Sequence, residues 1–407
     1  MVTTDMAGPG AVIVGGAHVS LGIARSLGRR GIPVWLLANH PLPKFSRYVK
    51  RSFDWCGADH PDGLQQILNV GVKHDLQGWV LIPTGDQDLR LIAQNRAQLS
   101  GMFRVAAADW ECVQWAYDKR MTHRRAHSLG IDVPWSFEPQ NLDDVRALDC
   151  RFPVILKPAY RKGVDAFTLA KAWKAENRDM LISLYREASS LVGADAVIVQ
   201  EWIPGAGSTQ FSCAGLWERG EPLALLTARR SRQHPIDFGR SSTFVETIVQ
   251  EDVEEIACRF MRSLAYTGVA EVEFKYDARE RRFNLLDVNA RFWTWCGVGA
   301  RAGVDFPHLG YLQALGRTFG TGRARAGVAW MHPRSDVKAA WEEMRRGSLS
   351  LRSYLAGLRQ PLTFANFAVD DPLPALMEVP AALLNRLPLR KNAATLSPAR
   401  GRLRAAK

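Results

Sequence analysis

Residues 268–291, GVAEVEFKYDARERRFNLLDVNAR, are the stretch that decides the fold. They read as two strands joined by the charged turn at 277–282. Because side chains alternate faces along a strand, Asp287, Asn289 and Arg291 share one side, and the apolar residues between them face the other. The second strand therefore presents a carboxylate, an amide and a guanidinium on one face.

The expected register of this hairpin brings two carboxylates together. If Asp277 lies opposite Phe283, then Glu273 lies directly across from Asp287, and opposed carboxylates repel unless a cation lies between them. Mg²⁺ commonly takes one or two protein carboxylates together with substrate phosphates, and Asn289 would add an amide oxygen. An exposed acidic hairpin that only faces water accounts equally well for this stretch taken alone.

The composition is that of a soluble globular enzyme or binding protein, with 47% apolar and 23% charged residues. At 407 residues the chain is long enough for about two to four domains. No stretch reaches the roughly 18 apolar residues of a membrane span, and the first residues do not resemble a secretory signal. The six cysteines are scattered without CxxC pairs, which indicates reduced thiols in a cytoplasmic protein.

Basic residues outnumber acidic ones by 53 to 41, which gives a formal net charge of +12. Such an excess is typical of nucleic-acid binding. However, residues 386–407 hold seven basic residues and no acidic one, so more than half of the excess lies in one tail. We therefore expect no nucleic-acid partner, and the tail is either a solubilising end or a segment that touches anionic surfaces.

The N-terminal region has the pattern of a Rossmann-like βαβ unit. Residues 11–37 run from an apolar strand, AVIVGG, through a helix to a second strand, IPVWLL. Gly15 and Gly16 allow a tight turn that aims backbone N–H groups at an anion. The spacing departs from G-x-G-x-x-G and no acidic residue follows the second strand, so the indication of dinucleotide binding is weak.

A second strand-to-helix unit follows, in which the strand WVLIPT ends in Thr84, Gly85 and Asp86. Polar residues just beyond the carboxyl end of a strand lie where open α/β sheets bind ligands. Thr84 and Asp86 are therefore candidate substrate residues, although Asp86 also suits a plain helix N-cap.

Further along the chain, basic residues occupy positions suited to an anionic ligand. Lys119 opens a helix, and Lys157 ends the apolar strand FPVILK before a glycine-containing turn, a position that suits phosphate. The segment ARRSRQHPIDFGRSSTFVETI, residues 228–248, is too polar for the core, so we expect a solvated or anion-binding loop. His123 and His127 have the spacing of a metal-chelating pair, but without a third ligand nearby a solvated helix face is expected.

In this order the motifs resemble those of the ATP-grasp superfamily, on its carboxylate–amine ligase side. Asp118-Lys119 with GIDVPWS resembles the entry to the nucleotide domain, Lys157-Pro158 the second phosphate lysine, and VIVQEWIPG the strand that links two lobes. GVAEVEF and LLDVNAR resemble the paired metal-binding strands. The resemblance covers roughly residues 8–320.

The resemblance implies an α/β fold with a Rossmann-like pre-ATP-grasp domain at 1–110 and a two-lobed α+β ATP-grasp domain. The small lobe would span 111–200, and the large lobe with the metal-binding strands 201–320. A small, mainly helical C-terminal extension with its basic tail would occupy 321–407.

The resemblance also assigns roles to residues of this sequence. It implies catalytic Arg291, Lys157 and Arg230; metal-binding Glu273, Asp287 and Asn289; nucleotide-binding Lys119, Lys157, Gln200, Glu201, Trp202, Ile203 and Gln210; and substrate-side Thr84, Asp86, Arg229, Arg232 and Gln233. Three features depart from the family pattern: Asp287 where Glu is commoner, a single glycine, Gly163, in the loop after Lys157, and no ribose-binding acid before Gln210. Gln210 or Ser208 is expected to replace that acid.

The implied activity is that of an ATP-dependent carboxylate–amine ligase. ATP, with Mg²⁺ or alternatively Mn²⁺, would phosphorylate a carboxylate, and an amine would attack the acyl phosphate to leave an amide, ADP and phosphate. Two other classes stay open: a nicotinamide-dinucleotide oxidoreductase that uses the N-terminal glycine turn, and a non-catalytic nucleotide-binding protein. The sequence specifies neither the acid and the amine nor the oligomeric state.

Overall fold

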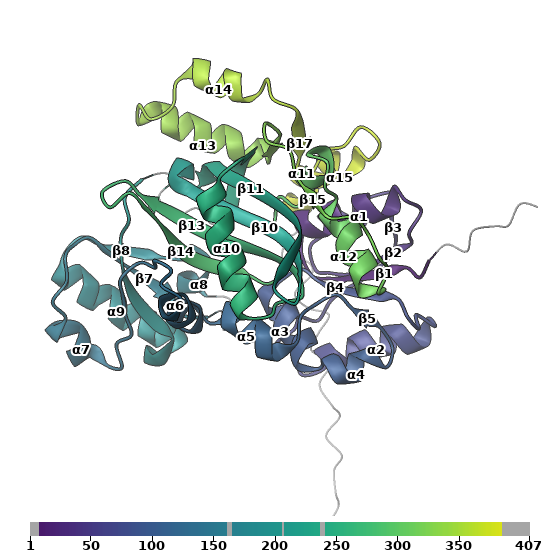
Figure 1. The fold of residues 1–407 in the computed structure, drawn as a ribbon, viewed down its shortest axis with the longest axis horizontal. Helices are drawn as coiled ribbons and strands as arrows, with labels where there is room; N and C mark the ends of the chain where they lie inside the picture. Colours follow the sequence, from purple (N-terminus) through teal and green to yellow (C-terminus); the bar gives the residue numbers. More distant parts are fainter. Residues whose placement is uncertain (1–7, 161–164, 206, 237–240, 385–407) are drawn as a thin grey trace, which may run out of the picture.

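The chain folds around three β-sheets (Figure 1). The structure is a computed structural model that describes residues 8–160, 165–205, 207–236 and 241–384. The basic tail at 386–407 and the turn containing Gly163 lie outside these residues. Within them, no helix has both the length and the apolar content needed to cross a bilayer.

The first sheet is the predicted Rossmann-like unit, with five parallel strands in the order β3-β2-β1-β4-β5. Its strands are Ala11–Val14 (β1), Val34–Leu37 (β2), Val49–Phe53 (β3), Val80–Pro83 (β4) and Arg104–Val105 (β5). Its helices are His18–Gly28 (α1), Gly63–Lys73 (α2), Asp86–Gln94 (α3) and Arg96–Ser100 (α4), with a 3-10 turn at Leu42–Phe45 (η1). The central strands β1 and β4 are fully buried, as expected of a parallel sheet covered on both faces.

The second sheet forms the small lobe, with four strands in the order β6-β9-β7-β8. The strands are Ser136–Phe137 (β6), Val154–Pro158 (β7), Trp173–Ala175 (β8) and Val197–Glu201 (β9), and the helices are Leu142–Ala147 (α7), Ala166–Ala170 (α8) and Arg178–Val192 (α9), with a 3-10 turn at Ala194–Ala196 (η2). Two helices that we expected in this lobe, Trp110–Tyr117 (α5) and Lys119–Ser128 (α6), instead pack on β14 of the large sheet.

The third sheet has the order β14-β13-β10-β11-β12-β16-β17, with β15 paired to β11. Its strands are Gln210–Glu218 (β10), Glu221–His234 (β11), Ser241–Ile248 (β12), Gly268–Asp277 (β13), Arg282–Asn289 (β14), Gly322–Arg323 (β15), Ala329–Met331 (β16) and Leu362–Phe364 (β17). The helix Glu251–Ser263 (α10) crosses this sheet (Figure 1), and Val298–Arg301 (α11) and Phe306–Ala314 (α12) follow the hairpin. A 3-10 turn at Gly207–Thr209 (η3) precedes β10.

The prediction of a loop at 228–248 is wrong. In the described part of this segment, β11 continues to His234 and β12 begins at Ser241. Polar side chains can be buried here because they are paired: Arg232 forms a buried ion pair with Asp336 at 2.8 Å. A buried charge is tolerated when it is paired and hydrogen-bonded, so polarity alone does not exclude a core strand.

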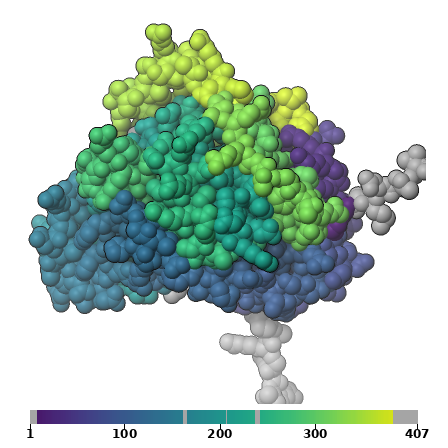
Figure 2. All heavy atoms as spheres, in the orientation of Figure 1, coloured from purple at the N-terminus to yellow at the C-terminus, as the bar shows by residue number. Residues whose placement is uncertain are grey.

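The C-terminal region is more than a helical extension. Its strands β16 and β17 complete the large sheet, and its helices are Pro333–Arg345 (α13), Leu351–Gly357 (α14) and Leu373–Leu384 (α15). The segment before α15 is tied to the first domain by ion pairs of Arg25 with Asp371 (2.9 Å) and Arg29 with Asp370 (2.7 Å). In Figure 2 the yellow-green atoms of this region form the top of the molecule.

The β13–β14 hairpin has the predicted carboxylate pairing but reaches it by another register. Glu273 lies opposite Asp287, as predicted, whereas Asp277 pairs one residue before Phe283. A β-bulge after Glu273 inserts one extra residue and restores the expected pairing. That residue, Leu286, lines the cavity described below instead of facing the core.

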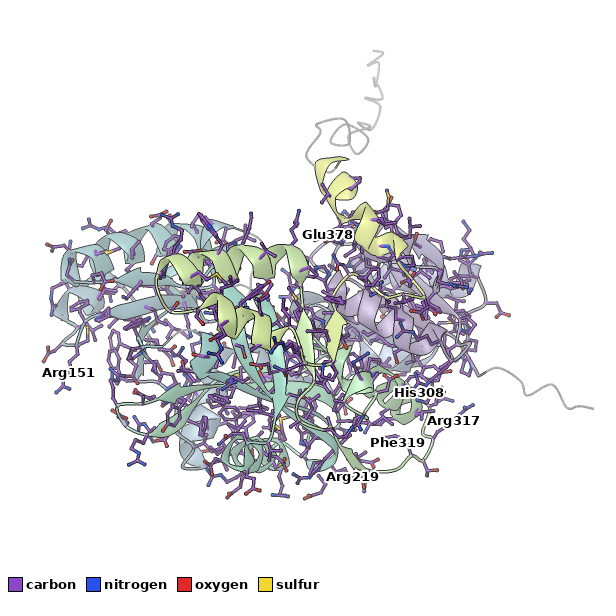
Figure 3. The ribbon with its side chains drawn as sticks, turned by 90° about the horizontal axis from the view of Figure 1, so that it is seen from above. Arg151, Arg219, His308, Arg317, Phe319 and Glu378 are labelled. Carbon is purple, nitrogen blue, oxygen red and sulfur yellow. The ribbon has the colours of Figure 1, made fainter. Side chains whose placement is uncertain are left out.

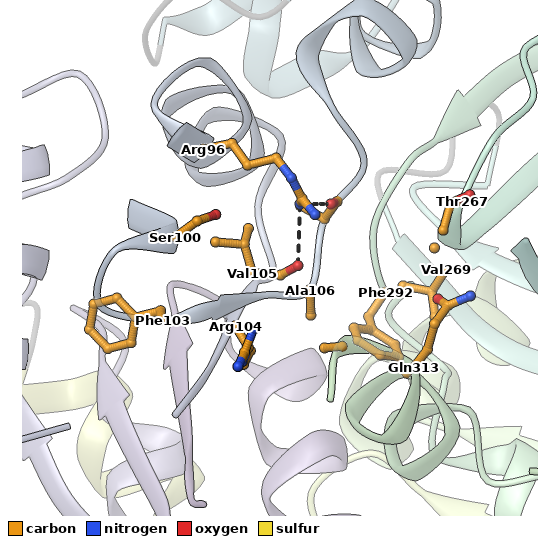
Figure 4. Close-up of a pocket in the computed structure, with 14 residues that line it drawn as sticks. Arg96, Ser100, Phe103, Arg104, Val105, Ala106, Thr267, Val269, Phe292 and Gln313 are labelled. Atoms are coloured by element: carbon orange, nitrogen blue, oxygen red, sulfur yellow. Dashed lines mark hydrogen bonds between the residues drawn. The ribbon is translucent and has the colours of Figure 1, made fainter. Parts of the chain in front are cut away.

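A small cavity of about 220 Å³ lies where the first domain meets the large lobe (Figure 4). Its walls include Phe292, Val269 and Gln313 from the large lobe, and Arg96 donates to the carbonyl of Val105 (3.2 Å) across its first-domain side. The two domains therefore meet through an interface that is partly polar and not completely filled.

Candidate functional site

A cavity of about 610 Å³ is lined by residues of the first domain, the small lobe and the large lobe. It contains most of the residues assigned from the sequence: Asp86, Lys119, Lys157, Gln200, Glu201, Trp202, Ile203, Gln210, Arg230, Gln233, Glu273, Asp287, Asn289 and Arg291. The fold thus gathers motifs that lie far apart along the chain.

The two predicted metal carboxylates are each held by a cation from another element. Glu273 accepts from Arg230 of β11 (3.2 Å) and from Nδ2 of Asn289 (2.8 Å). Asp287 forms an ion pair with Lys119, the first residue of α6, at 2.7 Å. Burial alone would raise the pKa of Glu273, but Arg230 and neighbouring lysines outweigh it and lower that pKa. The Glu273 carboxylate therefore stays ionised.

A third carboxylate, Glu271, received no role from the sequence. It is buried two residues before Glu273 on the same face of β13, and it accepts from Ser212 (2.9 Å) and from Nδ2 of Asn289 (3.1 Å). Burial and the charge of Glu273 raise its pKa. The alternation along the strand would have found this residue. Its observed contacts anchor the Asn289 amide.

Two lysines in the cavity, Lys171 and Lys275, were also missed. Lys275 follows Glu273 by two residues on the same strand face and donates to the carbonyl of Gly205 (2.7 Å), whereas no sequence pattern singles out Lys171. Burial and neighbouring cations lower the pKa of Lys275 and of Lys157 to about 8. Six lysines and arginines line the cavity against four carboxylates. This surplus of buried positive charge suits a polyanionic ligand.

Arg291 links the hairpin to the first domain. Its Nε lies 2.5 Å from Oδ1 of Asp86 at the start of α3, and another guanidinium nitrogen donates to Oδ1 of Asn289 (3.2 Å). Burial would lower the pKa of Arg291, but Asp86 raises it. The pair places one positive and one negative group side by side in the cavity wall.

The predicted hinge strand β9 lines the small-lobe side. Lys157 of β7 donates to the side chain of Gln200 (2.8 Å). The Glu201 carboxylate accepts from the backbone N–H of Trp135 (2.9 Å), so this side chain fixes the hinge. Trp202 and the end of the strand follow directly in the cavity wall.

Three residues that we assigned to the substrate do not line the cavity. Thr84 is buried and donates to the carbonyl of Val14 (2.8 Å). Arg229 is paired with Glu246 (3.3 Å), and Arg232 with Asp336. Alternation turns Arg229 away from the side of Arg230, and the register shifts on either side of Arg232 break that alternation and let it reach Asp336. Of the described arginines of this segment, Arg230 therefore lines the cavity.

The two histidines of α6 lie in different surroundings. His123 is buried with Nε2 3.4 Å from the carbonyl oxygen of Leu286, while His127 is exposed, so the predicted solvated face holds for His127 alone. Burial and the charge of Lys157 lower the pKa of His123 to about 4, which keeps its ring neutral.

The glycine turn of the first domain is filled by the protein's own carboxylate. A Cβ on Gly15 would lie 2.0 Å from Oδ2 of Asp88, and one on Gly16 would lie 2.4 Å from the Ser20 hydroxyl. Asp88 is buried and accepts from Nε1 of Trp55 (3.0 Å). Burial raises its pKa to about 6 in spite of that hydrogen bond. A pyrophosphate seated directly over Gly15 would meet the Asp88 carboxylate, which argues against the oxidoreductase alternative.

Comparisons with known proteins agree with this architecture. No protein-family model matches the chain. Over 278 residues, 62% of this chain and 64% of that relative, the sequence is 23% identical to the D-aspartate ligase of Enterococcus faecium. The chain thus matches less than two thirds of the length of this curated relative.

Two solved structures have a similar fold. One is the biotin carboxylase domain of the 2-oxoglutarate carboxylase of Hydrogenobacter thermophilus in complex with MgADP, ADP and bicarbonate, with a TM-score of 0.62, 13% identity, and coverage of 78% of this chain and 73% of that one. The other is the L-amino acid ligase of Bacillus licheniformis, with a TM-score of 0.58, 16% identity, and coverage of 75% and 74%. The predicted mixed α/β fold is confirmed.

Proposed function

We propose that this chain, which has the ATP-grasp fold, is an ATP-dependent ligase that joins a carboxylate to an amine and releases ADP and phosphate. One observation carries the proposal: the opposed carboxylates of Glu273 and Asp287 lie in a cavity with a surplus of buried cations. The named relatives in sequence and in fold, a D-aspartate ligase and an L-amino acid ligase, support the same reaction class.

The hairpin residues fit Mg²⁺ or Mn²⁺. Such an ion takes one or two carboxylates, here Glu273 and Asp287, and completes its coordination with phosphate oxygens and water. In the described ranges no three His, Cys, Asp or Glu side chains cluster as a metal site. Asn289 presents Nδ2 to Glu271 and Glu273, so its amide must turn before its oxygen can become a ligand. The bound ion would neutralise charge on the β- and γ-phosphates.

The cations of the cavity would hold the triphosphate. Lys119 is held by Asp287, and a divalent ion at that carboxylate would release the lysine for a phosphate oxygen. Lys157 and Lys275 remain mostly protonated at neutral pH with pKa values of about 8, and a polyanion beside them offsets the cost of burying their charge.

The acceptor would be an amino acid. Arg291 suits its carboxylate, and Asp86, 2.5 Å away, suits its ammonium group. Gln233 lines the same cavity, and its Nε2 donates to the carbonyl of Ile236 (2.6 Å). Each group of a zwitterion would therefore meet a partner of opposite character.

The reaction would proceed in two steps. The carboxylate oxygen bonds to the γ-phosphorus and ADP leaves; the amine then attacks the acyl carbon, phosphate leaves and the amine loses a proton. Arg291 would stabilise negative charge at the acceptor in the first step. Enclosure of the cavity would protect the acyl phosphate from water.

A screen of ADP release against amino acids paired with small amines and amino acids tests this function. We expect release that depends on Mg²⁺ and on both partners, with an amide as product. ATP binding without turnover for any pair would favour the non-catalytic alternative. Absence of ATP binding would show that the assignment of a nucleotide site to this cavity is wrong.

A further inference from the structure

The C-terminal region carries most of the exposed apolar side chains of the described residues. Nine of the fourteen large apolar side chains that are exposed there lie between positions 337 and 379: Val337, Trp341, Leu351, Leu355, Phe367, Val369, Leu373, Leu376 and Val379. We call the four of these that lie on α13 and α14, Val337, Trp341, Leu351 and Leu355, the C-terminal face. Exposed apolar residues scattered singly need no explanation, whereas a group of them on neighbouring helices marks an interaction surface.

The spacing of these side chains gives two helices an apolar side. Val337 and Trp341 on α13 are four residues apart and each 59% exposed, and Leu351 and Leu355 on α14 have the same spacing with 62% and 50% exposed. Residues four apart lie on one side of a helix. Figure 3 looks down on α13 and α14, which lie outermost over the large sheet, with α15 beside them.

In α13 and α14 the basic side chains are exposed, whereas the acidic side chains are buried or paired. The exposed basic side chains are Arg334, Lys338, Arg345, Arg346 and Arg352, with Arg359 just after α14. Arg334 is paired with Glu378 of α15 (3.4 Å). Of the acidic side chains, Asp336 and Glu343 are buried and Glu342 is paired with Arg346 (2.7 Å). Positive charge therefore surrounds the apolar side chains without an equal number of exposed carboxylates.

We propose that the C-terminal face binds the surface of an anionic lipid bilayer. Exposed Trp and Leu side chains flanked by Lys and Arg are the composition that lies in the headgroup region of such membranes. A second copy is the poorer occupant, because two like-charged faces would repel across a twofold interface. Residues 386–407, with seven basic residues and no acid, would likewise be repelled by this face but attracted to the same lipid.

Sedimentation of the full chain with vesicles tests the proposal. We compare vesicles of phosphatidylglycerol mixed with phosphatidylcholine against phosphatidylcholine alone, at low and high salt. The wild type should bind only the anionic vesicles and less at high salt. Trp341→Ser with Leu355→Ser should weaken binding by about tenfold or more. The matched control, Val72→Ser with Val249→Ser, removes side chains that are 69% and 71% exposed elsewhere and should bind as the wild type does.

Four results would overturn the proposal. The first is no binding of the wild type to anionic vesicles, and the second is unchanged binding of the Trp341 and Leu355 variant. The third is that the wild type is a dimer and the variant a monomer, which would show that the C-terminal face binds a second copy of this chain. The fourth is complete loss of binding on deletion of 386–407 while the variant binds normally, which would assign binding to the tail alone. ADP release in solution by the variant should equal that of the wild type, so failure here is separable from failure of the proposed reaction.

Discussion

Two regions of this molecule carry sequence signals for anion binding but differ in structure: the glycines after β1, and the cavity between the lobes, which the start of α1 also lines. Both lie beside strand ends, where α/β proteins bind anions. In the glycine turn, Asp88 occupies the space above Gly15, and burial raises its pKa to about 6. The cavity has about 610 Å³ of space and six cations against four carboxylates. An anion site therefore requires open volume and uncompensated positive charge as well as a suitable turn.

The largest effect is expected from removing both metal carboxylates. Glu273→Gln with Asp287→Asn keeps the side-chain shapes but removes both carboxylate charges that would hold Mg²⁺, so ADP release should fall below about one thousandth of wild type. Asp88→Asn is the matched control in the glycine turn, and its turnover per folded molecule should be unchanged. Persistent turnover of the double variant would leave the hairpin without a metal role, and loss of turnover in the control would make the glycine turn functional.

Arg291→Ala should separate binding from chemistry. It removes one charge donor at the acceptor, so turnover should fall by on the order of 10²–10³, while ATP affinity measured by calorimetry stays near that of wild type. Arg262→Ala, which removes an arginine paired with Glu221 outside the cavity, is the control. Near-normal activity of the Arg291 variant would exclude this residue from the reaction.

The choice between ATP and NAD as the bound nucleotide compares the cavity with the glycine turn directly. ATP with Mg²⁺ at a hundredfold excess over its Kd should stabilise the fold by about 2.7 kcal/mol. NAD and NADP should not shift the Tm, because Asp88 fills the glycine turn. Thermal unfolding with each nucleotide checks this, and stabilisation by NAD without any by ATP would reverse the assignment of the two sites.

The affinity for ATP should weaken above pH 8. Burial lowers the pKa of Lys157 and of Lys275 to about 8, so both lose their charge as the pH rises through that value. ATP favours the charged form, so its Kd should rise by about tenfold per lysine between pH 7 and pH 9. Titrations across this range should show a shallower slope for Lys157→Met. A Kd that does not change with pH would show that these lysines do not contact phosphate.

Deletion of 386–407 should have the smallest effect. This segment has no acidic residue and little apolar periodicity, so folding and turnover in solution should be unchanged. A lower Tm or slower ADP release would show that the tail is structural.

Local sequence patterns were sufficient to predict the hairpin, the first domain and the hinge strand, because strand alternation and glycine turns depend on only a few neighbouring residues. The register of the hairpin could not be obtained this way, since a bulge at Leu286 shifts it without a sequence signal. The strands at 228–248 were missed because Arg232 is satisfied by Asp336, a partner 104 residues away. The closure of the glycine turn by Asp88 likewise depends on a contact between separate elements.

Trapping the activated acid tests the central claim most directly. With an acid identified by the screen, hydroxylamine in place of the amine should yield a hydroxamate and an equal amount of ADP, because it attacks the acyl phosphate. AMP and pyrophosphate as products would contradict phosphoryl transfer and require an adenylated acid instead.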